Sequence, residues 1–148
     1  MVEAEMSKKA GPEVALWRTW ALRLIFLAMF IILGNQQWTY ILTEDTEGWH
    51  RWRGVGHAML AALSLLALLG VFHPLKALPL MIFEMVWKAI WLTIIALPAW
   101  QDGREIPDIV DATASSIGIA LLLIVIPWPY VWWRYVTEPI EPWRRNRT

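Results

Sequence analysis

The sequence predicts an all-α membrane protein, a bundle of four transmembrane helices with a short C-terminal interfacial segment. Hydrophobic residues make up 57% of the chain, 12 of its 148 residues are tryptophan, and polar loops separate its four apolar runs. Tryptophans that bracket apolar runs are typical of membrane-interface belts, and an apolar helix needs about 20 residues to cross the hydrocarbon. The predicted spans are about 17–40, 55–72, 75–97 and 108–126, and the interfacial segment is 128–136.

The first predicted span follows a polar N-terminal tail, residues 1–13, which we expect in the cytoplasm. Arg18 and Arg23 lie near the start of the span, where long side chains can extend to the lipid headgroups. A cleaved signal peptide is the alternative interpretation. No small-x-small cleavage site follows the apolar run, and the polar residues 35–37 come instead. We therefore predict a retained span.

The second and third spans are predicted to form an antiparallel hairpin, because only residues 73–76 separate them. The second span carries Gly54, Ala58 and Ala62 at four-residue spacing, a pattern that lets a neighbouring helix approach closely. Proline does not continue a helix, so Pro98 predicts the end of the third span.

The fourth span is predicted to begin with Asp108 and Asp111 in its first turns, where carboxylates complement the helix dipole. It should end at Pro127. The segment 128–136 that follows is too short to cross the membrane and very aromatic, which favours a position on the membrane surface. Residues 137–148 form a basic tail that we expect in the cytoplasm.

The orientation follows from the distribution of lysine and arginine, which are concentrated on the cytoplasmic side of membrane proteins. With both termini inside, the inner side carries Lys8, Lys9, Arg18, Arg23, Lys76, Arg134, Arg144, Arg145 and Arg147, whereas the outer side carries Arg51, Arg53 and Arg104. We expect a multi-pass protein of the cell membrane, and specifically of a bacterial inner membrane. The net charge is zero, which gives no electrostatic basis for nucleic-acid binding.

Two charged residues near the middle of the third span are the most informative feature of the sequence. Glu84 and Lys88 are four residues apart and share a helical face with Trp87 and Trp91. An ionisable group at the bilayer centre costs about 2.5–3.5 kcal/mol, so this face should meet protein or an aqueous cavity. One interpretation is a titratable or ligand-binding site with the tryptophans stacked on the ligand. The residue pattern favours the other, an ion pair that neutralises itself and fixes the rotation of the helix.

A second polar cluster is predicted nearer the outer face, formed by Gln37, His57, Asp108, Asp111 and Ser115. If their helices face one another, these residues line a polar vestibule open to the outside. In the alternative, which we favour, the aspartates cap a helix, the amide lies at a wet interface, and His57 bonds a backbone carbonyl.

Catalytic and cofactor signatures are not expected in this chain. It contains no cysteine, which excludes thiolate metal sites, and the predicted topology places His57 and His73 on opposite sides of the membrane, which disfavours haem ligation between them. No metalloprotease, nucleophile-elbow, phosphate-loop or dinucleotide motif is present. We assign no catalytic residue, metal or cofactor.

The layout resembles several families of small bacterial four-span membrane proteins, among them the DoxX-like group. A membrane glutamate beside tryptophan also resembles the small multidrug transporters. The chain departs from that second pattern in two ways. Its glutamate, Glu84, lies on the third span with Lys88 beside it, and its charge bias disfavours dual topology.

Three functions fit these features. The first, and the one that the sequence favours, is a non-enzymatic subunit or assembly partner in a membrane complex, either as a homo-oligomer or with a larger protein. The second is a proton-linked transporter or binder of a small lipophilic or charged molecule that uses Glu84 and Lys88. The third is an oxidoreductase component with a quinone-like ligand near Trp87 and Trp91.

Overall fold

The computed structural model describes residues 11–104 and 112–139, and all regular elements in this part of the chain are helical. Three continuous helices are long and apolar enough to cross a membrane: Leu16–Thr43, Arg51–Phe72 and Leu78–Gln101. A bent pair, Thr113–Val125 with Trp128–Thr137, meets the same test when taken together. The predicted all-helical fold is therefore confirmed for the described residues, and by length and composition three helices could cross a membrane, or four if the bent pair is one span.

The first helix combines α2 (Leu16–Ala28), the π-helical turn η1 (Met29–Leu33) and α3 (Gly34–Thr43). The backbone N–H of Gly34 reaches the carbonyl of Met29, five residues earlier, which is the bond of a π turn. The short 3₁₀ turn η2 (Thr46–Gly48) then leads into α4 (Arg51–Phe72). Helix α4 begins four residues before the predicted start at 55, because the basic residues assigned to the loop form its first turn.

The third helix combines α5 (Leu78–Trp91), the π turn η3 (Leu92–Ala96) and α6 (Leu97–Gln101). The predicted span 75–97 is displaced at both ends, since residues 74–77 form the turn after α4. The prediction that Pro98 ends the helix is wrong. The N–H of Leu97 bonds the Leu92 carbonyl, which shifts the hydrogen-bond ladder just before Pro98, and the proline then lies in the first turn of α6, where a missing donor is tolerated.

The last described elements are α7 (Ala112–Val125), α8 (Trp128–Trp132) and the π turn η4 (Trp133–Thr137). The axis bends by 76° between α7 and the α8–η4 segment. The 14 residues of α7 extend over about 21 Å, which is shorter than the hydrocarbon. A straight fourth span and a surface position for 128–136 therefore remain predictions, and the predicted start of this span, with Asp108 and Asp111, lies outside the described residues.

Two side chains donate hydrogen bonds to backbone carbonyls at the bend around Pro127. Proline has no N–H for the carbonyl of Leu123, and the indole N–H of Trp128 donates to this oxygen at 2.9 Å. The guanidinium of Arg18, from α2, donates to the Ile126 carbonyl at 2.8 Å. Arg18 thus ties the first helix to the end of α7 instead of extending to the headgroups.

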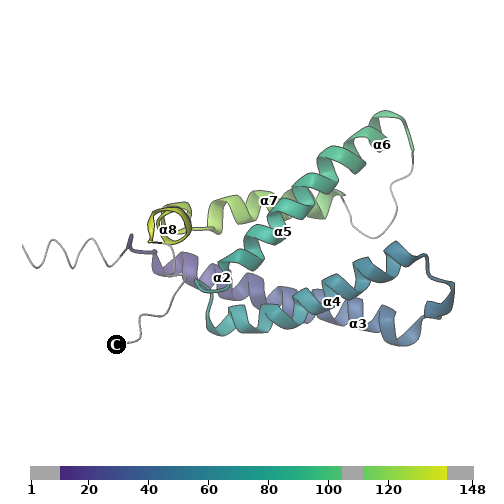
Figure 1. The fold of residues 1–148 in the computed structure, drawn as a ribbon, viewed down its shortest axis with the longest axis horizontal. Coiled ribbons are helices and arrows are strands. Elements are labelled where there is room, and N and C mark those ends of the chain that lie inside the picture. Colours follow the sequence, from purple (N-terminus) through teal and green to yellow (C-terminus); the bar gives the residue numbers. More distant parts are fainter. Residues whose placement is uncertain (1–10, 105–111, 140–148) are drawn as a thin grey trace, which may run out of the picture.

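The first helix and α4 pack along each other, α7 packs against α2 and α5, and α5–α6 runs obliquely to the others and diverges from α4 (Figure 1). Two of the small residues of α4 that we predicted at a helix contact, Ala58 and Ala62, are exposed and contact no other helix of the described chain closely. The buried face of α4 instead carries His57, Ala61, Leu63, Ser64, Ala67 and Gly70.

The hydrophobic core lies at one end of the bundle, next to the turn between α4 and α5. It consists of Leu22, Phe26, Ala67, Leu78, Met81, Leu122, Val125 and Ile126. All four helical units contribute to this cluster, so the bundle is tightly packed at this end. Beyond this core, starting at Glu84, residues from all four helical units line a cavity.

Candidate functional site

A cavity of about 630 Å³ lies between the four helical units, directly beyond the core. The first helix and α4 contribute a mostly apolar wall, whereas α5 and α7 contribute the charged and hydroxyl groups. The lining residues are Ile25, Ala28, Met29, Ile32, Leu33, Gln36, Gln37, Leu60, Glu84, Trp87, Lys88, Ala114, Ser115 and Leu121. The lining extends from Glu84, one turn past the core, to Gln37 near the other end of the bundle.

The carboxylate of Glu84 is the most buried charged group of this lining, with 3% of the residue exposed. Its Oε2 atom accepts from the ammonium of Lys88 at 2.8 Å and from the indole N–H of Trp87 at 3.1 Å. The Lys88 nitrogen also lies 5.5 Å from the centre of the Trp87 ring, within the range of a cation–π contact. Trp87 therefore contacts both members of the ion pair and holds them on one side of the cavity.

Helix α7 faces this pair with its smallest residues. A Cβ atom added at Gly118 would lie 3.8 Å from the Lys88 nitrogen, so the α7 backbone comes close to the ammonium. Ser115, one turn earlier, is 1% exposed, and its hydroxyl has no hydrogen-bond partner within the described part of the chain. A buried hydroxyl without a partner is unfavourable unless a further group satisfies it.

Three of the four residues that we predicted on the α5 stripe, Glu84, Trp87 and Lys88, line this cavity together. Trp91, the fourth, is partly buried and does not line it. The helix α5–α6 diverges from the first helix and α4 toward its C-terminal end (Figure 1).

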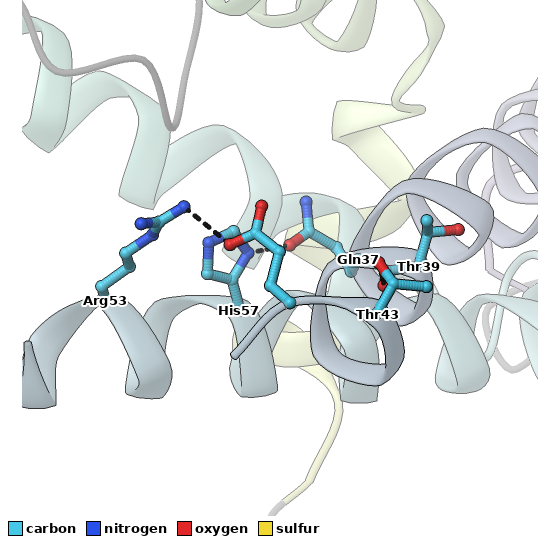
Figure 2. A network of polar contacts seen from close by, with 6 residues as sticks. Gln37, Thr39, Thr43, Arg53 and His57 are labelled. Atoms are coloured by element: carbon cyan, nitrogen blue, oxygen red, sulfur yellow. Dashed lines mark hydrogen bonds and ion pairs between the residues drawn. The ribbon is translucent and has the colours of Figure 1, made fainter. Parts of the chain in front are cut away.

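Gln37 and His57, both predicted in the outer cluster, form a direct bond between α3 and α4 (Figure 2). The His57 Nδ1 and Gln37 Oε1 atoms are 2.6 Å apart, and the two residues are 4% and 3% exposed. Because the amide oxygen only accepts, His57 donates from Nδ1. The favoured expectation that His57 bonds a backbone carbonyl is therefore wrong, since a side-chain amide takes that role.

Aromatic and charged residues that the sequence analysis did not include surround His57. Its ring centre lies 5.3 Å from that of Tyr40 and 4.8 Å from that of Trp49. Arg53, one turn earlier on α4, pairs with Glu44 at 3.2 Å (Figure 2). Its guanidinium also lies over the Trp49 ring, 5.1 Å from the ring centre. The four-residue spacing of Arg53 and His57 on one helix could have predicted that these two side chains lie close together. The contacts that Tyr40, Glu44 and Trp49 make with them depend on how α3 and the loop after it pack on α4.

The outer cluster is thus only partly assembled within the described residues. Gln37 and Ser115 line the same cavity as Glu84, whereas His57 lies behind Gln37 and does not line it. Asp108 and Asp111 lie outside the described residues, so a vestibule that includes them stays a prediction.

Residues 11–104 and 112–139 contain no group of three or more histidine, aspartate or glutamate side chains placed to hold a metal ion. Comparisons with protein-family models, curated proteins and solved structures give no match. The cavity and its polar groups are therefore the basis for a functional assignment.

Proposed function

We propose that this protein binds a small lipophilic molecule within the membrane, in the cavity between its helices, and serves as a binding or carrier protein. The observation that carries the proposal is the position of the Glu84–Lys88 pair. The pair lines an accessible cavity together with Ser115, whose buried hydroxyl has no hydrogen-bond partner in residues 11–104 and 112–139. A pair with a purely structural role has no need of such a space.

The size and lining of the cavity support this assignment. Small-molecule sites typically occupy about 300–1,000 Å³ and combine a mostly apolar lining with a few convergent polar groups. The cavity of about 630 Å³ has apolar side chains from the first helix on one side and Glu84, Lys88 and Ser115 on the other. A ligand with an apolar body and one polar group fits this division.

The proposal includes a position in the cell membrane with both termini in the cytoplasm, which the distribution of lysine and arginine supports. In that orientation the packed core lies toward the cytoplasmic side. The cavity extends from Glu84 toward Gln37, and thus toward the outer side.

A second candidate is the role of a subunit or assembly partner, which the sequence favoured. The observation that supports it is the exposed face of α4 with Ala58 and Ala62, where small side chains would let another transmembrane helix approach. Under this candidate the Glu84–Lys88 pair fixes the rotation of α5 in the bundle.

Two phenylalanine variants separate the candidates. Ala28→Phe places a large ring in the cavity lining, and Ala58→Phe places the same ring on the exposed face of α4. The tagged proteins would be extracted in a mild detergent, and native mass spectrometry would record bound small molecules and protein partners. We expect wild type and Ala58→Phe to carry a small molecule that Ala28→Phe lacks. Loss of a protein partner in Ala58→Phe, with equal small-molecule content in all three proteins, would favour the subunit role.

A further inference from the structure

We propose that the cavity selects an uncharged lipophile that carries an oxygen acceptor, such as a ketone, quinone or alcohol, and that Lys88 and Ser115 bind this oxygen. The inference rests on the proposed binding function and specifies its ligand. It follows from the charge balance of the lining and from the hydrogen-bond donors that the protein leaves unused.

The charge balance excludes an ionic ligand. Glu84 and Lys88 are the only charged side chains in the described lining, and they compensate each other at 2.8 Å. An anion or cation beside them would be an unpaired charge, or would have to separate the pair. An uncharged molecule leaves the pair intact.

Two hydrogen-bond donors of the lining, on Lys88 and Ser115, have capacity for an oxygen acceptor of the ligand. Glu84 Oε2 already receives N–H groups from Lys88 and Trp87. The Lys88 ammonium has three N–H groups, of which the carboxylate takes one. Ser115 lines the same cavity, and its hydroxyl is buried without a partner in the described residues. A carbonyl or hydroxyl oxygen placed between α5 and α7 would satisfy both donors.

The remaining lining sets the character of the rest of the ligand. Opposite the polar groups lie Ile25, Met29, Ile32 and Leu33 of the first helix. The indole of Trp87 is held in place by its bond to Glu84 and by Lys88 over its face. An aromatic or polyunsaturated body would pack against this surface.

Benzophenone and 4-benzoylbenzoate test the inference, because they share one photoreactive carbonyl skeleton and differ in charge. The full chain in lipid nanodiscs would be irradiated with each probe, and peptide mass spectrometry would give the fraction of label within 25–37, 84–88 and 114–121. We expect benzophenone to label these cavity segments of the wild type at least tenfold more, relative to the rest of the chain, than the anionic probe does.

Variants of the ion pair should change this preference in a defined way. Glu84→Gln leaves the Lys88 charge uncompensated, so the anionic-to-neutral labelling ratio should rise at least tenfold. The double variant Glu84→Gln, Lys88→Gln is uncharged and should return to the wild-type ratio. Ser115→Ala should lower benzophenone labelling at least threefold without changing the ratio. Glu138→Gln is the matched control, since Glu138 pairs with Arg134 at the same i,i+4 spacing outside the cavity.

The outcomes distinguish failure of the ligand class from failure of the binding function. Equal labelling of the wild-type cavity by the two probes, or an unchanged ratio in folded Glu84→Gln, would overturn the proposed ligand class. If Glu84→Gln does not fold, the wild-type ratio and Ser115→Ala decide the question. Cavity labelling of the wild type no greater than that of Ala28→Phe, for both probes, would refute the binding function itself.

Discussion

Gly70 lies where α4 crosses the first helix, and a methyl group at this position has no space. A Cβ atom there would lie 2.3 Å from Cδ1 and 2.4 Å from Cγ of Phe26, which is fully buried in the core. Rotation of the phenyl ring cannot relieve this overlap, because Cγ lies on the rotation axis. Gly70→Ala must therefore separate the two helices or displace Phe26 from its rotamer.

The magnitude follows from two opposing effects. Overpacking of a core typically destabilises a protein by about 1–3 kcal/mol, and contacts as short as these belong at the upper end of that range. Replacement of glycine by alanine inside a helix stabilises by about 1 kcal/mol. We therefore expect Gly70→Ala to lower the free energy of unfolding by about 2 kcal/mol.

Gly56→Ala provides the matched control on the same helix. No atom lies within 4 Å of a Cβ added at Gly56, so this variant keeps the helix-propensity gain without the overlap. Unfolding by sodium dodecyl sulfate in mixed micelles, followed by circular dichroism, would compare the two variants with the wild type. Equal midpoints for Gly70→Ala and Gly56→Ala would refute the packing of Gly70 on Phe26.

Three further predictions concern hydrogen bonds between or within the helices, and the same unfolding assay measures each. His57→Ala leaves the buried Gln37 amide oxygen without its donor and should lower stability by about 1–3 kcal/mol, whereas His57→Phe with Gln37→Leu removes both partners and should lower it less; the reverse order would contradict the buried bond. Arg18→Met should lower stability by about 1.5–3 kcal/mol, since it removes a charged donor from the carbonyl at the end of α7; an unchanged midpoint would exclude this tie. Trp128→Phe keeps an aromatic ring but removes the donor to Leu123, with an expected loss of about 0.5–1.5 kcal/mol; a midpoint equal to that of the wild type would show that the bond is unimportant.

Helix length and apolarity allowed the main helices to be predicted from the sequence, but their details depend on tertiary structure. Pro98 has the local signature of a helix end, and only the π turn before it explains why the helix continues. On α4, small residues occur on two faces, so spacing alone could not distinguish the exposed Ala58 face from the packed Gly70 face. The Gly70 face is the packed one because Phe26, on another helix, lies against Gly70.

In the candidate site, too, contacts within one helix could be predicted from the sequence, whereas contacts between helices could not. The Glu84–Lys88 pair followed from the i,i+4 spacing on one helix. That Ser115 and Gly118 lie near this pair could not be predicted from the sequence, because it depends on how α7 packs on α5. The helical period also placed Trp91 on the Glu84 face, but it does not reveal which part of that face the neighbouring helices leave open, and Trp91 does not line the cavity.

The π turn η1 (Met29–Leu33) has a consequence for the chain lengths that the first helix tolerates. A π turn contains one residue more than the α-helical bonding pattern needs. Deletion of one residue within 29–33 would produce an uninterrupted α-helix, and the halves on either side would keep their present faces. The same deletion within α2 would rotate all earlier residues by about 100° relative to the rest, which would turn Phe26 or Arg18 away from its contact. The fold can therefore accommodate the loss of one residue from the first helix at the π turn. Natural variants whose first helix is one residue shorter should have the deletion there.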